Sequence, residues 1–181
     1  MRRDSVNWAQ FDTSLGRCGI AWSARGVLAV QLPESSDQAT RARLLRPRPE
    51  ATEAAPPTHI AAAISAIVAL LAGERTDLTG IPIDPAGISA FDQRVYAIAR
   101  AIPPGQTLTY GDIARRLGDL TLSRAVGQSL GRNPYVIIVP CHRVLAAGKK
   151  IGGFSAAGGT KTKLDLLSIE GVELREPDLF D

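Results

Sequence analysis

Cysteine and histidine are scarce in this sequence, with two residues of each among 181. Cys18 and Cys141 are far apart and flanked by unlike sequence, which is not the framework of a disulfide-rich secreted domain and suits a reducing cytoplasm. Together with His59 and His142 they do not form any usual spacing of a zinc site. The sequence therefore predicts neither structural disulfides nor a bound metal.

Long hydrophobic runs are also missing. The longest, residues 60–72, is too short to span a bilayer. The first ten residues carry charges but lack the apolar stretch of a secretory signal. We therefore expect a cytoplasmic protein with no membrane partner.

The net charge is only +3, but the charge is unevenly distributed. Residues 1–87 contain nine Lys/Arg and nine Asp/Glu, residues 88–171 contain eleven and five, and residues 172–181 contain one and four. A basic second half favours a polyanionic partner such as nucleic acid, although many domains that bind none are equally basic.

Hydrophobic residues make up 45% of the chain and charged residues 22%, as in ordinary globular proteins. The length suits one large domain or two small ones. The stretch Asp84-Pro85-Ala86-Gly87 has the composition of a link between domains. We predict an α/β (α+β) fold with an N-terminal domain over 1–87 and a C-terminal domain over 88–181.

Strand and helix patterns alternate in the first half. Cys18, at the start of a strand pattern, is interpreted as structural, and Thr58 and Gly73 are expected to cap and end a helix. The expected elements are a hairpin over 16–32, a short helix near 37–45, a helix over 59–71 and an edge strand over 81–83.

The second half has helical patterns, each preceded by a residue that can cap it, namely Ser89, Thr109 and Ser123. The expected helices cover residues 90–102, 110–117, 124–131 and 160–170. The two short central helices, separated by a few residues, have the pattern of a helix-turn-helix. Many such pairs never bind DNA, so the pattern by itself is only moderately specific.

A buried strand is predicted at Ile137-Ile138-Val139, because β-branched residues favour strands and Pro140 then ends the ladder. Cys141 follows, with a histidine directly after it. A thiol becomes a useful nucleophile when a base or positive charge supports its thiolate. Taken alone, this cysteine is more simply explained as a small buried residue.

A glycine-rich loop over 152–159 follows the cysteine segment. Glycines this dense suit a backbone that closely approaches a ligand. A flexible connection explains the same composition equally well.

Residues 91–171 closely resemble the O6-alkylguanine-DNA alkyltransferases, also called methylated-DNA–protein-cysteine methyltransferases. The similarity is strongest in the specific run from Pro140 to Val144, Pro-Cys-His-Arg-Val. The remaining matching segments are Thr109-Tyr110-Gly111-Asp112-Ile113-Ala114, Arg124-Ala125-Val126-Gly127, Asn133-Pro134, Gly158-Gly159, Lys163 and Glu170-Gly171. The resemblance implies an RNase H-like α/β N-terminal domain and a mostly helical C-terminal domain with a winged-helix-like helix-turn-helix.

The resemblance also implies a reaction, in which the alkyl group of O6-alkylguanine moves irreversibly and once per molecule onto Cys141. His142 would act on the thiol through a water, and Glu170 would hold the other imidazole nitrogen. Asn133 would brace the active-site turn. Tyr110 would donate a hydrogen bond to the base. No cofactor is implied.

The same resemblance assigns the pocket for the guanine. The backbone N–H of Ser155 would point at O6, and the carbonyls of Cys141 and Val144 would accept from the exocyclic amine. Pro140 and Phe154 would form apolar walls. Phe154 stands where many members have tyrosine, and Ala156-Ala157 lengthen the loop, so the role of Ser155 is less secure than that of Cys141.

Duplex DNA that contains O6-alkylguanine is the implied partner of a monomeric protein, with cooperative binding left open. A base must leave the stack to react. Arg124 would fill its place from the minor groove. The other expected DNA contacts are Tyr110, Gly111, Ser123, Ala125 and Gly127. The segment Gln128-Ser129-Leu130-Gly131 departs from the smaller residues usual there.

Two alternatives remain. A non-catalytic relative would bind damaged DNA without repairing it, but such relatives lack the cysteine that is present here. A cysteine–histidine hydrolase needs a direct thiol–imidazole pair, which adjacent residues do not favour.

Overall fold

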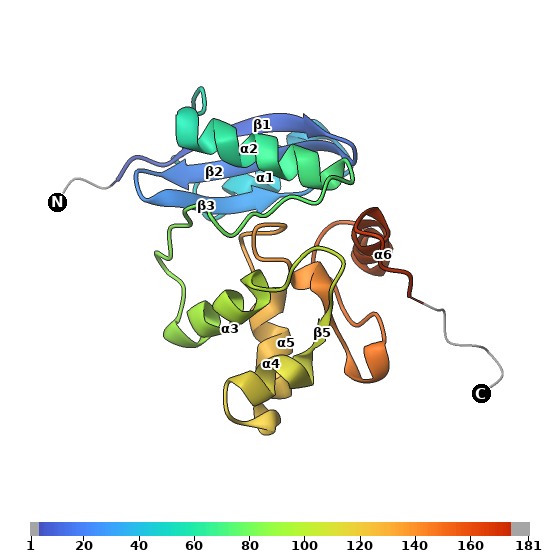
Figure 1. Cartoon of the computed structure of the whole chain (residues 1–181). Helices are drawn as coiled ribbons and strands as arrows, with labels where there is room; N and C mark the ends of the chain where they lie inside the picture. The colour runs from blue at the N-terminus through green and yellow to red at the C-terminus, as the bar shows by residue number, and fades with distance from the viewer. Residues whose placement is uncertain (1–3, 175–181) are drawn as a thin grey trace.

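A four-stranded sheet with a helix on each face forms the first half of the computed structural model, which describes residues 4–174 (Figure 1). The strands are β1 (Asn7–Thr13), β2 (Gly16–Ser23), β3 (Gly26–Gln31) and β4 (Thr52–Glu53), in the order β3-β2-β1-β4. The first three are antiparallel, and β4 runs parallel to β1. Helix α1 (Asp37–Leu45) lies behind the sheet and α2 (Thr58–Leu71) in front of it.

Strand β2 is buried on both faces of the sheet. Successive side chains of a strand point to opposite faces, and here a helix covers each face. Ile20 packs in the main core with Ile67 of α2. Ala21, one residue later, packs in a smaller cluster with Leu44 of α1. The alternating side chains of β2 therefore pack against α2 on one face and against α1 on the other.

Sequence patterns located the hairpin and the helix over 37–45 correctly, but β1 and β4 were not anticipated. Thr58 is not the cap of α2, because the helix begins at Thr58 itself, after Pro57, with no side-chain cap. The expected edge strand over 81–83 is reduced to a single bridge between Val27 and Ile83.

The second half is mostly helical. Ser89 caps α3 and Thr109 caps α4, as expected, and Asp112 completes a reciprocal capping box with Thr109. The elements are α3 (Ala90–Arg100), β5 (Leu108–Thr109), α4 (Tyr110–Arg116), η1 (Leu120–Leu122), α5 (Ser123–Gly131), η2 (Cys141–Arg143), β6 (Val144–Leu145), η3 (Ala147–Lys149) and α6 (Gly159–Ile169).

Helices α4 and α5 are the two expected short helices, but Ser123 does not cap α5. Its hydroxyl donates to the carbonyl of Leu120 at 2.7 Å, inside the connection. Asp119 begins that connection by accepting from the Thr121 N–H at 2.9 Å, and the single-turn helix η1 leads directly into α5.

The strand predicted at 137–139 is wrong. Ile137, Ile138 and Val139 are buried as expected, but they form a turn in which Ile137 has a φ of 75° and the Val139 N–H donates to the Tyr135 carbonyl at 2.8 Å. The cause is Asn133, whose side chain binds both the Tyr135 N–H and the Val139 carbonyl at 2.9 Å. The segment wraps around this side chain and makes no sheet.

The segment around Asp84 joins the two halves. Asp84 accepts from the Ser23 hydroxyl at 2.5 Å, and its carbonyl accepts from the Tyr135 hydroxyl, also at 2.5 Å. One hydrophobic core continues across both halves. The boundary between residues 87 and 88 therefore stays a prediction.

Within residues 4–174, every helix is too short or too polar to cross a membrane.

Candidate active site around Cys141

Cys141 begins the single turn η2 directly after Pro140. Its side chain is largely covered, with 7% of the residue exposed. It nevertheless lines a cavity of about 310 Å³ whose other walls come from α4, α5 and the loop before α6. The lining residues are Tyr110, Gly127, Leu130, Gly131, Cys141, Gly153, Phe154 and Ser155. Cys141 is thus a largely covered residue in the wall of a cavity.

A buried chain of hydrogen bonds lies beside the thiol. His142 Nε2 is 2.8 Å from Glu170 Oε1, and both side chains are almost fully covered. Arg143 donates to both oxygens of the same carboxylate, at 2.7 and 2.9 Å, and to the Ile102 carbonyl at 2.6 Å. The carboxylate at the end of α6 therefore orients the imidazole, and Arg143 orients the carboxylate.

The pKa values of Glu170 and His142 are set by their burial and by these hydrogen bonds and charges. Burial alone would raise the pKa of Glu170, but the hydrogen bonds from His142 and Arg143 and their charges outweigh it and lower the pKa to about 2. Burial lowers the pKa of His142, more than Glu170 raises it. The pair is therefore a neutral imidazole held by an ionised carboxylate.

The thiol is kept protonated at rest. Burial raises the pKa of Cys141, while the Asn133 side chain and the positive charge of Lys163 act in the opposite direction. Cys18 is also buried, and the pKa of its thiol is raised to about 11 with only Thr13 nearby to lower it. Of the two cysteines, only Cys141 has a cation, a histidine and a cavity beside it, and Cys18 is structural, as the sequence suggested.

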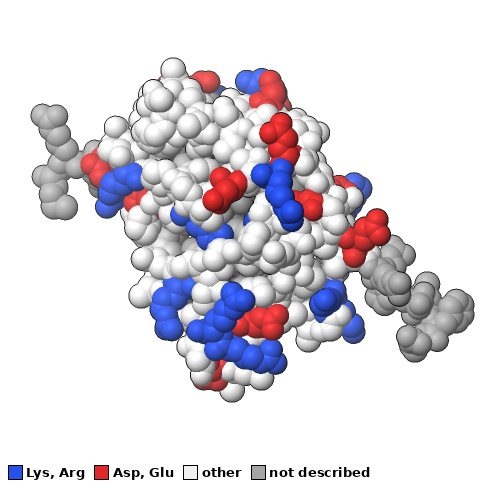
Figure 2. Space-filling view, in the orientation of Figure 1, with Lys and Arg blue, Asp and Glu red and all other residues white. Residues whose placement is uncertain are grey.

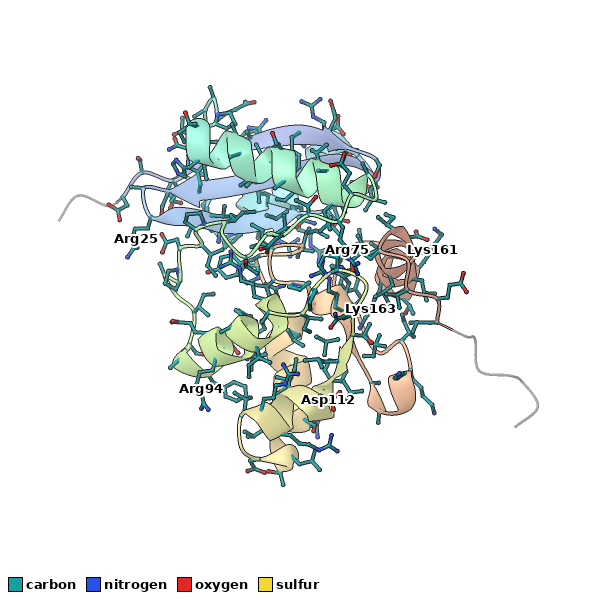
Figure 3. The ribbon with its side chains drawn as sticks, viewed as in Figure 1. Arg25, Arg75, Arg94, Asp112, Lys161 and Lys163 are labelled. Carbon is teal, nitrogen blue, oxygen red and sulfur yellow. The ribbon has the colours of Figure 1, made fainter. Side chains whose placement is uncertain are left out.

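Lys163 has a position in this site that the sequence analysis did not assign. It is completely buried and points from α6 toward the centre of the molecule, unlike Lys161 two residues earlier (Figure 3). Its Nζ donates to the carbonyls of Val144 at 2.6 Å and Gly153 at 3.2 Å, and burial lowers its pKa to about 8. A buried lysine is rare unless it is paired, and its place in the matching sequence segments was the available signal.

Tyr110 forms the wall opposite the glycine-rich loop. It is half-buried, and burial raises the pKa of its hydroxyl. A Cβ on Gly152 would lie 3.0 Å from that hydroxyl, and Gly152 has a φ of +68°, so this position requires glycine. The loop backbone is therefore close to the Tyr110 side chain at Gly152, and its approach to a ligand stays a prediction.

The structure brings only part of the predicted set to the cavity. Tyr110, Gly127, Cys141, Phe154 and Ser155 line it together. Pro140 and Val144 are buried beside Cys141, but they are not among the described residues that line the cavity, and the Val144 carbonyl is bonded by Lys163.

Gly111, Ser123, Arg124 and Ala125 lie outside the cavity, on the helix pair. Arg124 is exposed at the start of α5. On the face seen in Figure 2, Lys and Arg gather at the bottom, where Figure 1 places α4 and α5.

The fold and the site together define a protein in which two short helices joined by a turn stand beside a cavity-lining cysteine and a buried histidine–glutamate pair. Residues 90–172 match the family described as 6-O-methylguanine DNA methyltransferase, DNA binding domain. The chain belongs to the methylated-DNA–protein-cysteine methyltransferase family, since it is 32% identical to the member from Methanothermobacter thermautotrophicus over 86% of this chain and 80% of that protein.

Other relatives agree. The methylated-DNA–protein-cysteine methyltransferase of Mycobacterium leprae is 44% identical over 67% of this chain and 72% of its own length. The crystal structure of Mycobacterium tuberculosis OGT in complex with DNA superposes with a TM-score of 0.74 at 32% identity, over 91% of this chain and 92% of that one.

Proposed function

We propose that this protein repairs DNA by moving the alkyl group of O6-alkylguanine onto Sγ of its own Cys141, once per molecule. The observation that carries the proposal is the position of Cys141, which lines a cavity and is next to the buried His142–Glu170–Arg143 chain. Because the sulfur–carbon bond formed is a stable thioether, the protein is consumed in the reaction.

His142 is the base in this proposal. Its Nε2 faces an ionised carboxylate and therefore carries the proton, which leaves Nδ1 as an acceptor. Nδ1 is buried and has no hydrogen-bond partner within residues 4–174. The thiol proton passes to Nδ1 through a water, the Sγ–carbon bond forms, and the carbon–O6 bond breaks with its electron pair going to the guanine.

The leaving guanine is negatively charged unless it is neutralised as it forms. We assign that task to the Tyr110 hydroxyl and the Ser155 N–H, because both residues line the cavity. The carbonyls of Cys141 and Val144 select guanine by accepting from its amine, while Pro140 and Phe154 enclose the alkyl group. Lys163 holds the Val144 carbonyl and supports the thiolate.

Duplex DNA is the proposed partner, bound by α4 and α5. Arg124 enters the duplex and replaces the flipped guanine, which offsets the cost of unstacking. Gly111, Ser123, Ala125 and Gly127 allow a close approach of the helix pair to the minor groove. We propose a monomer acting in the cytoplasm.

The finer fold assignments belong to the same proposal. The order β3-β2-β1-β4, with β4 parallel to β1, supports an RNase H-like N-terminal domain over 1–87. The short β5–β6 pair beside α4 and α5 supports a winged variant of the helix-turn-helix in the domain over 88–181.

Intact-mass measurement tests the function. A duplex with one O6-methylguanine should add one methyl group per protein molecule, on Cys141, and Cys18→Ala should react like the parent protein. Cys141→Ala should not react at all. Continued turnover, a methyl group elsewhere, or repair by Cys141→Ala would contradict the proposal, and binding without methyl transfer by the parent protein would favour a non-catalytic damage-recognition protein.

A further inference from the structure

A second cavity, of about 390 Å³, adjoins the reactive one. The two cavities share Gly131 and Ser155 as lining residues. One side of the second cavity comes from β3 and from the end of α1, and the other side comes from the segment after α5 and the glycine-rich loop. Four arginines line it, namely Arg43, Arg46, Arg48 and Arg132, and no Asp or Glu of the described chain does. We call this cavity the arginine cleft.

Two of the four guanidinium groups are engaged by carboxylates. Arg43 is paired with Glu34 at 2.5 Å, and its other terminal nitrogen donates to the Ser155 carbonyl at 2.8 Å. Arg132 is paired with Asp92 at 2.8 Å. Both arginines remain partly exposed. Their remaining guanidinium N–H groups can therefore bind a second anion while the bonds to Glu34 and Asp92 are kept.

The other two have no such partner. The Arg46 side chain is exposed, and within residues 4–174 its guanidinium makes no hydrogen bond or ion pair. Arg48 reaches only the carbonyls of Leu44 and Leu28, at 3.4 and 3.5 Å, which are long contacts. Burial lowers the pKa of Arg48, and the nearby charge of Glu50 only partly opposes this. A partly buried cation with so little compensation favours an anion beside it.

We propose that the arginine cleft binds a backbone phosphate of the DNA strand that carries the damaged guanine. This inference rests on the proposed function, because a guanine in the reactive cavity remains joined to its strand. The strand must leave that cavity, and the cleft adjoins it at Gly131 and Ser155, which line both. One guanidinium can donate two parallel hydrogen bonds to two oxygens of a phosphate. A phosphate has further acceptor sites, so it can bind more than one of the four arginines.

The four arginines lie outside α4 and α5, and three of them, Arg43, Arg46 and Arg48, come from the end of α1 and the segment after it. The site therefore gives this part of the N-terminal half a role in DNA binding. The contact from Arg43 to the Ser155 carbonyl also joins the phosphate site to the loop that lines the reactive cavity.

Salt-dependent binding is the first test. Cys141→Ser is used as the background so that the complex does not react, and the probe is a duplex with one O6-methylguanine. The Arg46→Gln/Arg48→Gln protein should bind about five- to twenty-fold more weakly at low salt, and the slope of log K against log salt should fall by about 1–2. The control is Arg41→Gln in α1, the helix that precedes these two arginines, because Arg41 lies 4.7 Å from the Trp8 ring and does not line the cleft.

Methylphosphonate substitution identifies the ligand. Each phosphate near the lesion is replaced in turn by an uncharged methylphosphonate. At one or two positions the replacement should weaken binding of the Cys141→Ser protein and have little effect on the Arg46→Gln/Arg48→Gln variant. No such coupling at any position, or an equal loss in Arg41→Gln, would overturn the inference. Competition by inorganic phosphate without positional coupling would mean a free-anion site and would overturn it as well.

Free benzylguanine has no phosphate and reports on the reactive cavity in proteins that retain Cys141. If the arginine variant loses alkyl transfer from benzylguanine as strongly as from DNA, the cleft residues act on the fold and the inference is wrong. Failure of the proposed function can be told apart from failure of this inference. In the first case the parent protein would leave Cys141 unmodified. The phosphate coupling is measured separately, on the Cys141→Ser protein, which cannot react.

Discussion

His142 and Glu170 are joined by a 2.8 Å hydrogen bond between Nε2 and Oε1, although 28 residues separate them in the chain. The carboxylate is shared, because Arg143 binds both of its oxygens. Three consecutive residues, Cys141 to Arg143, thus supply the nucleophile, the imidazole and the cation that fixes the carboxylate. The geometry of the site depends on this one carboxylate.

Glu170→Gln removes the charge and keeps the shape. Arg143 would then be a buried cation without a counter-ion, so we expect the free energy of unfolding to fall by about 3–5 kcal/mol. Urea unfolding measures this. Asp165→Asn is the control, because its pair with Lys161 is exposed and should change stability by less than about 1 kcal/mol. A loss below 1 kcal/mol in Glu170→Gln would show that Arg143 finds another partner.

Stability should fall as the pH is lowered below about 6.5. The pKa values of His142 and Glu170 are both lower in the fold than their ordinary values of 6.5 and 4.5, so the unfolded chain binds more protons as the pH falls. The contribution of Glu170 is complete above 4.5 and is lost as the pH falls toward about 2. Denaturant midpoints measured from pH 8 to pH 3 test this, and the decline below pH 4.5 should be shallower in Glu170→Gln.

Arg124→Ala should impair repair of duplex DNA far more than reaction with free benzylguanine. Flipping a base costs a few kcal/mol, so we expect about a 100-fold slower reaction with the duplex. Second-order rate constants for both substrates provide the comparison. Arg17→Ala, which removes an exposed arginine from β2, is the control and should change neither rate. Equal losses on both substrates in Arg124→Ala would exclude the flipping role.

Methylation of Cys141 should destabilise the protein. Only 7% of Cys141 is exposed, so an added methyl group crowds a packed site, at a cost of about 1–3 kcal/mol. For a chain of this size that lowers Tm by about 2–10 °C. Melting curves before and after reaction measure the shift, with Cys141→Ser exposed to the same DNA as the control. An unchanged Tm would mean that the cavity accommodates the group without strain.

Local signals predicted those elements whose start or end depends on a single side chain. Thr109 and Ser89 were predicted as caps from their residue type. The structure confirms both, since each side chain accepts from an N–H three residues later. The same argument failed at Ser123, because Asp119 and the turn η1 begin the connection earlier. It failed at 137–139 because Asn133 binds the backbone on both sides of that segment, and strand propensity does not include such a competitor.

Strand β4 could not be read from local pattern, because its two residues are exposed and it is held by pairing with β1. The same limit applies to the site. Lys163 was visible as part of a matching segment, but its complete burial and its bonds to Val144 and Gly153 arise from the packing of α6 against η2.

By itself, the sequence determined the family and most of the helices and singled out Cys141 as the candidate nucleophile, because these depend on contiguous motifs and on caps within a few residues. Only the tertiary structure decided which groups surround the sulfur, how Arg143 and His142 share one carboxylate, and that four arginines from both halves line one cleft. Such contacts join residues that are far apart in the chain, such as Arg43 and Ser155, which are 112 positions apart. No local pattern specifies a distance across the fold.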